Sequence, residues 1–168
     1  MPHEPALMPN PNVTFRPATS EDSAAIAEIM RTAFAEHRGK ILPDSSALRE
    51  TAESAAEFLR TGQVFLAEIA GRPIGCVQAK LEGDTVYLGR LSVLPESRRR
   101  GVAAGLMARV EDYAREVGAA SVMLKVRIAL SQNQRIFLSR GYREVGRETH
   151  AGFDRPTSIR MQKPVNAR

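Results

Sequence analysis

A run of three arginines and a glycine, Arg98-Arg99-Arg100-Gly101, stands between two segments of different periodicity. The segment before it, residues 85–94, is rich in apolar and β-forming residues and predicts a strand. The segment after it carries apolar residues at three- and four-residue spacing, which predicts a helix over about residues 101–117. The chain therefore passes from a strand through a short basic turn into a helix, and this order constrains the fold more than any other feature.

The basic turn has the chemistry of a phosphate-binding site. The first amides of a helix lack intrahelical acceptors and carry positive dipole character, so they attract anionic oxygens. Gly101 and Ala103 keep bulk away from the main chain, and arginines bind phosphate through paired N–H donors. The turn is not a Walker loop, because residues 101–107 lack the Gly-Lys-Ser/Thr ending, and it is not the dinucleotide fingerprint. The alternative interpretation is a solvated charge run before an ordinary helix.

The pattern Arg-x-x-Gly-x-Ala, which runs from Arg98 to Ala103 after Leu91-Ser92-Val93-Leu94-Pro95-Glu96, resembles the acyl-CoA-binding motif of the GNAT N-acetyltransferases. The resemblance covers residues 13–163, nearly the whole chain. It implies an α/β fold of the α+β, mixed-sheet kind. In that fold a central, mostly antiparallel twisted sheet contains one splayed pair of parallel strands, and helices flank both faces.

The remaining periodicity agrees with that order of elements. Strands 64–69, 73–81 and 85–94 predict an antiparallel meander, and strand 121–127 should run parallel to strand 85–94 because a helix connects the two. Residues 1–12, with four prolines, predict a flexible N-terminal tail, and residues 13–168 predict a single domain. The other predicted elements are strands 13–16, 142–148 and 157–163 and helices from about 19 to 34, 45 to 59 and 131 to 140.

The resemblance also implies where the cofactor binds. Coenzyme A would lie between the splayed strands, with the backbone of Leu91 and Val93 pairing with its pantetheine arm and the N–H of Leu91 or Ser92 polarising the thioester carbonyl. An ordinary core strand is the alternative interpretation of Leu91 and Val93, and the two are compatible. The pyrophosphate would be held by the basic turn and the first helical residues, namely Arg98, Arg99, Arg100, Gly101, Val102, Ala103 and Ala104.

The segment from Asn133 to Tyr142 matches the family pattern with one departure. Phe137 occupies the place of a tyrosine often proposed to protonate the leaving thiolate, and a phenyl ring cannot donate a proton. Phe137 is therefore expected to pack, against either the cofactor arm or the core. Asn133 could hydrogen-bond the pantetheine arm or take part in catalysis, or else cap its helix. Tyr87, the nearest phenol by sequence, is the second candidate catalytic residue.

In this family the acceptor side is built from the first two helices, their connection and the last hairpin. The corresponding candidates are Glu36, His37 and His150, and Glu36 together with Asp44 and Asp154 could attract a cationic substrate. A histidine exchanges protons near pH 7, although the sequence favours a solvated loop position for both histidines. No His/Asp/Glu group has metal-ligand spacing, so no metal is expected, and no Ser-His-Asp grouping suggests an acyl-enzyme.

The charge is unevenly distributed along the chain. The overall net charge is +5, but residues 1–84 carry −4 and residues 85–168 carry +9, which suits a ligand with several phosphates. A nucleic-acid partner is disfavoured, because aromatic residues are only 5% of the chain and do not interleave with the arginines. A single cysteine, Cys76, excludes an intramolecular disulfide. No apolar run approaches the roughly 20 residues of a membrane span, so a cytoplasmic protein is expected.

The sequence thus predicts an N-acetyltransferase. Acetyl-CoA would be the co-substrate, and a primary amine of a small molecule or peptide would attack it directly in a ternary complex. A homodimer paired through the last hairpin is compatible with this fold. Two other functions stay open: a non-catalytic acyl-CoA-binding or sensing module, which Phe137 makes credible, and a basic nucleic-acid-binding domain.

Overall fold

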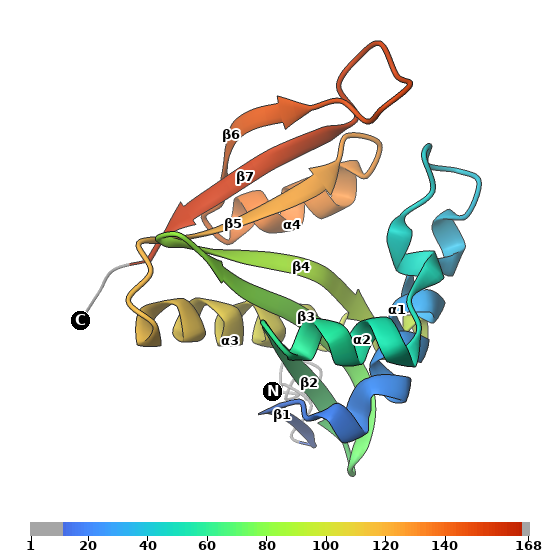
Figure 1. The fold of residues 1–168 in the computed structure, drawn as a ribbon, viewed down its shortest axis with the longest axis vertical. Coiled ribbons are helices and arrows are strands. Elements are labelled where there is room, and N and C mark those ends of the chain that lie inside the picture. The colour runs from blue at the N-terminus through green and yellow to red at the C-terminus, as the bar shows by residue number, and fades with distance from the viewer. Residues whose placement is uncertain (1–11, 166–168) are drawn as a thin grey trace, which may run out of the picture.

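A seven-stranded sheet in the order β1-β2-β3-β4-β5-β7-β6 runs through the protein in the computed structural model, which describes residues 12–165 (Figure 1). The predicted tail therefore lies outside the described residues except for Asn12. Neighbouring strands are antiparallel except β4 and β5, which confirms the predicted mixed sheet. The strands are β1 (Val13–Pro17), β2 (Gln63–Ile69), β3 (Arg72–Glu82), β4 (Thr85–Val93), β5 (Ser121–Arg127), β6 (Arg143–Glu148) and β7 (Ser158–Pro164).

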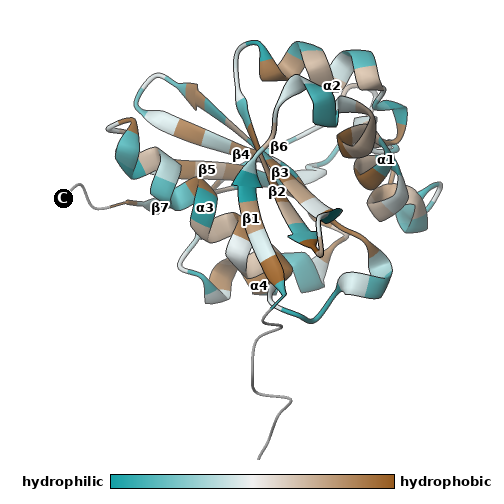
Figure 2. Ribbon diagram, turned by 90° about the horizontal axis from the view of Figure 1, so that it is seen from below, coloured by the Kyte–Doolittle hydropathy of each residue, from teal (hydrophilic) through white to brown (hydrophobic). Residues whose placement is uncertain are grey.

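Helices cover both faces of the sheet. Figure 2 shows α1 and α2 on one side and α3 and α4 on the other. The helices are α1 (Ser23–Phe34), α2 (Ala52–Leu59), α3 (Val102–Glu116) and α4 (Ser131–Ser139), with short 3₁₀ segments η2 (Ser20–Asp22), η3 (Ala35–His37), η4 (Ser46–Arg49) and η5 (Pro95–Ser97). In residues 12–165 no helix is long and apolar enough to cross a membrane.

Strand alternation divides the buried side chains between the two faces. Successive side chains of a strand point to opposite faces, so Val64 and Leu66 of β2 join the core beneath α1 and α2, whereas Phe65 joins the core beneath α3. The same rule applies to β5. Leu124 and Val126 belong to the core beneath α3, so Lys125, which lies between them, faces the other side of the sheet.

The helix predicted over residues 45–59 is interrupted, so that prediction was wrong in its detail. The chain forms η4, becomes extended at Glu50 with ψ 139°, and then starts α2. The restart has a local cause, because the Thr51 hydroxyl accepts a hydrogen bond from the Ser54 N–H at 3.0 Å and caps α2. The interruption lets Glu50 turn inward, where only 6% of it is exposed.

A buried polar cluster joins α3 to the C-terminal strands. Glu111 of α3 is 4% exposed and accepts hydrogen bonds from the Tyr142 hydroxyl at 3.0 Å and from the Lys163 ammonium at 3.1 Å. Arg140 lies 3.6 Å from the same carboxylate. Burial is the main cause that raises the pKa of Tyr142, and the neighbouring Glu111 raises it further. The hydroxyl therefore stays protonated and donates its hydrogen bond. The cluster satisfies a carboxylate that would otherwise be costly to bury.

We expect Tyr142→Phe to lower the free energy of unfolding by about 1–2 kcal/mol, because it removes one donor from a buried carboxylate while keeping the ring. Urea denaturation measures the change. Tyr113→Phe is the matched control, since in the described part of the chain its hydroxyl forms no hydrogen bond and its ring packs edge-on against Phe65. A Tyr142→Phe variant as stable as Tyr113→Phe would contradict the role given to the cluster.

Candidate active site

The two parallel strands separate after a short paired stretch. β4 and β5 are paired only at Thr85 with Ser121, Val86 with Val122 and Tyr87 with Met123. Beyond Tyr87, β4 continues along β3 and β5 continues along β7, so the facing edges of β4 and β5 diverge (Figure 1). The splayed pair implied by the sequence is therefore present.

The open edge of β4 exposes main-chain polar groups to this gap. The Leu94 N–H donates to Ile74 of β3 at 2.9 Å. Hydrogen-bonded pairs alternate along an antiparallel ladder, so Ser92 also faces β3, whereas the N–H and C=O of Val93 point to the open edge. A bulge at Arg90, where φ is 53°, puts Leu91 outside the ladder as well. Of the two predicted thioester contacts, Leu91 rather than Ser92 thus lies at the open edge.

The turn before α3 also leaves main-chain donors free. Across the described residues, no protein group accepts a hydrogen bond from the N–H groups of residues 99–104, and the first helical bond runs from Gly105 N–H to Gly101 at 3.0 Å. Gly101 is left-handed with φ 78°, and a Cβ added there would meet nothing within 4 Å. Amides without such acceptors lie at this helix N-terminus, which is the arrangement that binds anions; Arg99, Arg100, Gly101 and Ala104 are exposed, whereas Val102 is buried.

The three arginines of the turn have different surroundings. Arg98 is engaged by the protein: its guanidinium donates to Glu36 at 2.8 Å, to the Ala33 carbonyl at 3.2 Å and to the Val93 carbonyl at 3.3 Å. Arg99 and Arg100 are exposed and form no ion pair within residues 12–165. The Arg98 guanidinium thus fastens β4 to the end of α1, and Arg99 and Arg100 are the arginines of the turn whose side chains have no ion pair in residues 12–165. The binding of phosphate by all three stays a prediction.

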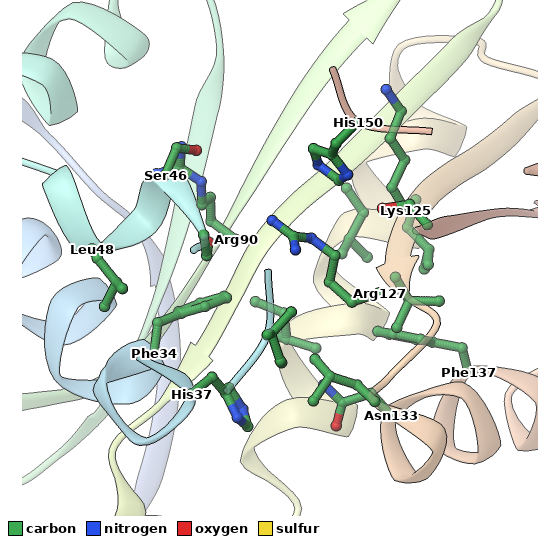
Figure 3. A pocket seen from close by; sticks show the side chains of 18 of the residues that line it. Phe34, His37, Ser46, Leu48, Arg90, Lys125, Arg127, Asn133, Phe137 and His150 are labelled. Atoms are coloured by element: carbon green, nitrogen blue, oxygen red, sulfur yellow. The ribbon is translucent and has the colours of Figure 1, made fainter. Parts of the chain in front are cut away.

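A cleft of about 250 Å³ opens where the strands diverge (Figure 3). Its walls come from β4, β5, the end of α1 and the segment that follows it, α4, and the loop between β6 and β7. The structure brings together six residues that the sequence analysis named: His37, Tyr87, Leu91, Asn133, Phe137 and His150. These residues span more than 110 positions of sequence, so only the fold makes them neighbours.

Tyr87 lies at the point where the strands separate, and it lines the cleft. Burial raises the pKa of this phenol above its ordinary value, against the opposing charges of Lys125 and Arg90. The hydroxyl is therefore protonated near neutrality and can donate a proton. Phe137 is 8% exposed, packs edge-on against Tyr142 at 6.2 Å between ring centroids, and also lines the cleft. Phe137 thus packs into the core and also forms part of the cleft wall.

Asn133 lies exposed in the first turn of α4, where it lines the cleft. Its neighbour Gln134, which the sequence analysis did not single out, fixes this end of the helix. The Gln134 side-chain amide donates to the carbonyls of Ile128 at 2.7 Å and Arg127 at 3.2 Å. Asn133 is left facing the cleft without such a structural task.

The acidic residues expected on the acceptor side do not line the cleft. Glu36 binds Arg98 and lies 3.4 Å from His37, while Asp44 accepts a hydrogen bond from the Gly39 N–H at 2.8 Å. Asp154 is 96% exposed in the last loop. The structure thus places none of these carboxylates on the walls of the cleft, and their attraction of a cationic substrate stays a prediction.

Cations line the cleft instead, and the sequence analysis missed them. Arg90 comes from β4, whereas Lys125 and Arg127 come from β5 (Figure 3). Strand alternation could have placed Lys125 and Arg127 on one face, since Leu124 and Val126 occupy the other. Nothing in the sequence shows that this face borders a cleft.

His150 is the titratable base candidate of the cleft. Its Nδ1 atom contacts the Thr157 hydroxyl, which fixes the ring. Burial lowers the pKa of His150 below the usual 6.5, and nearby Arg127 acts in the same direction. The imidazole is therefore neutral at pH 7 and able to accept a proton.

A second polar cluster holds the bulge of β4. The Arg90 guanidinium pairs with the buried Glu50 carboxylate and donates to the Ser46 hydroxyl at 2.6 Å. Glu50 also accepts from the Ser54 hydroxyl at 2.8 Å, and its carbonyl accepts from Arg31 at 2.5 Å. The open edge of β4 is thereby fastened to α1, η4 and α2.

Comparison with known proteins points to one family. The sequence model of the acetyltransferase (GNAT) family matches residues 24–142. Among curated proteins the sequence has no significant match. The fold resembles the PaiA N-acetyltransferase of Thermoplasma acidophilum solved with coenzyme A, at 16% identity and TM-score 0.76, covering 90% of this chain and 98% of that one.

Two further solved structures have the same fold. The ribosomal-protein-S18-alanine N-acetyltransferase of Escherichia coli is 19% identical with TM-score 0.74, covering 93% of this chain and 96% of that one. The Salmonella typhimurium protein YncA, solved with acetyl-CoA, is 23% identical with TM-score 0.70, covering 94% and 96% respectively. At these identities the likeness concerns the fold.

Proposed function

The chain belongs to the GNAT acetyltransferase family, and from this premise we propose that it transfers an acetyl group from acetyl-CoA to a primary amine of a small molecule or peptide. Two neighbouring features carry the proposal: the amides of residues 99–104, which have no acceptor in the described residues, and the open strand edge at Leu91 and Val93. The first feature suits a pyrophosphate. The second suits the amide groups of a pantetheine arm.

The residues of the cleft fit the cofactor. The amides of residues 99–104, with Arg99 and Arg100 beside them, would hold the pyrophosphate. The Val93 N–H would bind a pantetheine carbonyl, and the Leu91 N–H would polarise the thioester carbonyl. Asn133 and Phe137 would flank the arm from α4. In residues 12–165 no cluster of His, Cys, Asp and Glu is placed to hold a metal ion.

The proposed reaction is direct attack of the amine on the thioester. A protonated alkylamine has a pKa of about 10.4 and cannot attack, so its proton must first leave. Neutral His150 would accept it, directly or through water. The Leu91 N–H would stabilise the developing oxyanion. The Tyr87 hydroxyl would protonate the departing thiolate, the role that Phe137 cannot fill. A thiol has a pKa of about 8.5, so this proton contributes a moderate factor rather than an essential one.

A second candidate function rests on Phe137: an acyl-CoA-binding module without turnover. Calorimetric titration with acetyl-CoA, followed by free-thiol release over a panel of amines, separates the two. Tight binding with thiol release supports the enzyme, and tight binding without release supports the sensor. Absence of binding removes both, and a steep salt dependence of RNA or DNA binding would then favour a nucleic-acid module.

Gly101→Glu should weaken acetyl-CoA binding by at least about 30-fold, because a carboxylate at the helix N-terminus would repel the pyrophosphate. Isothermal titration measures the dissociation constant. Gly101→Asn is the matched control, since asparagine tolerates the left-handed conformation and adds no charge. Equal affinities for the Glu and Asn variants would contradict a phosphate site at this turn.

Tyr87→Phe should lower turnover by about 10²-fold with acetyl-CoA affinity unchanged, because it removes the proton donor and keeps the ring. Free-thiol release at saturating substrates gives the rate. Phe137→Tyr, which puts a phenol at the family's usual place, should leave the wild-type rate the same or raise it. Full activity in Tyr87→Phe would assign the proton to water.

The pH profile should report His150. The protonated amine predominates below its pKa and gives its proton to neutral His150, so kcat/KM should rise tenfold per pH unit below the lowered pKa of His150 and level off above it. The break should lie on the acid side of 6.5. His150→Gln should remove the break, whereas His37→Gln, on the opposite wall, should keep it. An unchanged profile in His150→Gln would exclude this base.

A further inference from the structure

We infer that the acceptor carries a carboxylate as well as its amine, and that Arg127 binds this carboxylate. The inference rests on the proposed function and names the substrate class of the same cleft. Three features support it: the position of Arg127 in the cleft, the lack of a carboxylate partner for its guanidinium in the described residues, and the positive charge of the cleft walls.

Arg127 faces the acceptor side of the sheet. Val126 belongs to the core beneath α3, so its neighbour Arg127 projects toward the side of α1 and η4. One of its guanidinium nitrogens donates to the Pro43 carbonyl, in the segment between η3 and η4, at 2.7 Å. Figure 3 shows the guanidinium reaching into the cleft between Arg90 and His150. The amides that suit the pyrophosphate belong to α3, on the opposite face, so Arg127 is not needed for the cofactor's phosphates.

Arg127 differs from the other cations of the cleft because it has no carboxylate partner among the described residues. Arg90 is paired with Glu50, and Lys125 lies 3.1 Å from Glu148. Asp44, the acid whose charge acts on Arg127, accepts a hydrogen bond from the Gly39 N–H instead. Asp44 opposes the lowering of the Arg127 pKa without forming an ion pair.

The unpaired guanidinium lies in an unfavourable place for a lone charge. Arg127 is half-buried, and burial is the main cause that lowers its pKa. The cleft that it enters is also lined by the apolar side chains of Phe34, Ile41 and Leu48. A guanidinium keeps its proton in proteins, so the charge is present and calls for an anion. Because residues 12–165 pair no carboxylate with it, a bound substrate can.

The size of the charge selects a carboxylate. One uncompensated cation balances a single negative charge, whereas a phosphate monoester carries up to two near pH 7. With one nitrogen on Pro43, the remaining N–H donors of Arg127 still offer a fork that fits the two oxygens of a carboxylate. No Asp or Glu lines the cleft, so a cationic acceptor such as a polyamine would meet the uncompensated charge of Arg127 beside the paired Arg90 and Lys125. A cleft of about 250 Å³ that must also admit the acetyl group suits a small molecule of amino-acid size.

The test compares matched amines. Amino acids, their amides and the amines left by removal of the carboxylate are each assayed with acetyl-CoA for free-thiol release, with phosphoethanolamine as a phosphate-bearing member and spermidine as a cationic one. We expect kcat/KM to be at least about 30-fold higher for the best amino acid than for its decarboxylated amine. This wild-type comparison stands whether or not any variant folds.

Arg127→Gln should lower kcat/KM for the amino acid by about 30-fold, because this substrate loses a charged hydrogen bond. The kcat/KM for the decarboxylated amine, which has no carboxylate to lose, should change by less than about threefold. Arg160→Gln is the matched control. Arg160 of β7 lies opposite Lys125, on the same face of the sheet, and does not line the cleft. The Arg160→Gln variant should leave kcat/KM for both substrates within about threefold of the wild-type values.

Three outcomes would overturn the inference: wild-type preference for spermidine or the decarboxylated amine, preference for phosphoethanolamine, or an equal loss for all substrates in Arg127→Gln. Thiol release with uncharged amines alone would remove the inference and keep the acetyltransferase. Failure to bind acetyl-CoA by calorimetry would instead remove the proposed function. Binding without thiol release from any amine would support the sensor and end the carboxylate assignment.

Discussion

Strands β4 and β5 share hydrogen-bonded pairing only from Thr85 to Tyr87, and the rest of the site depends on where this ladder stops. Unpaired main-chain groups are normally avoided at a sheet interior, because each loses a hydrogen bond when it leaves water. Here the two strands diverge after Tyr87. β5 stays paired with β7 along all of its length, and β4 stays paired with β3 up to Val93, so each strand is held on its outer side. The opening between them provides an edge to which an extended ligand can add.

Two polar clusters keep the walls of this opening in place. Arg98 joins the end of β4 to α1 through Glu36 and two carbonyls, and Arg90 joins the bulge of β4 to Glu50. The exposed Arg98–Glu36 pair contributes little stability by charge alone. The Glu50–Arg90 pair is more buried, and its value lies in geometry, because Arg90 adopts φ 53°, a conformation that a non-glycine residue needs surrounding contacts to maintain. The position of the Leu91 N–H follows from that conformation.

Local features were predictable from the sequence, and long-range partnerships were not. The basic turn, the helix after it and the strands on either side follow from periodicity and turn chemistry within about twenty residues, and the splayed pair came from the family resemblance. The long-range pairs that were missed share one cause. Glu36 and Arg98 are 62 positions apart and Glu50 and Arg90 are 40 positions apart, so nothing local marked those acids as occupied. The continuous helix over residues 45–59 failed for a local reason that was overlooked, the capping of α2 by Thr51. Arg127 was missed because strand alternation assigns a face but cannot say what borders it.

The two faces of the sheet divide recognition between main chain and side chain. On the α3 side, the groups suited to a pyrophosphate are amides, which every residue except proline carries, so their presence depends on backbone course and on the conformational freedom of Gly101. On the side of α1 and η4, the groups that line the cleft are side chains, namely Arg90, Lys125, Arg127, His37 and His150. Backbone donors can be retained while side chains are exchanged, since strand geometry tolerates many residues at exposed positions. The cofactor half of such a site is therefore set by the fold, whereas the acceptor must be inferred from the particular charges that line the cleft. Among the cleft-lining arginine and lysine side chains, Arg127 is the one without a carboxylate partner in the described residues.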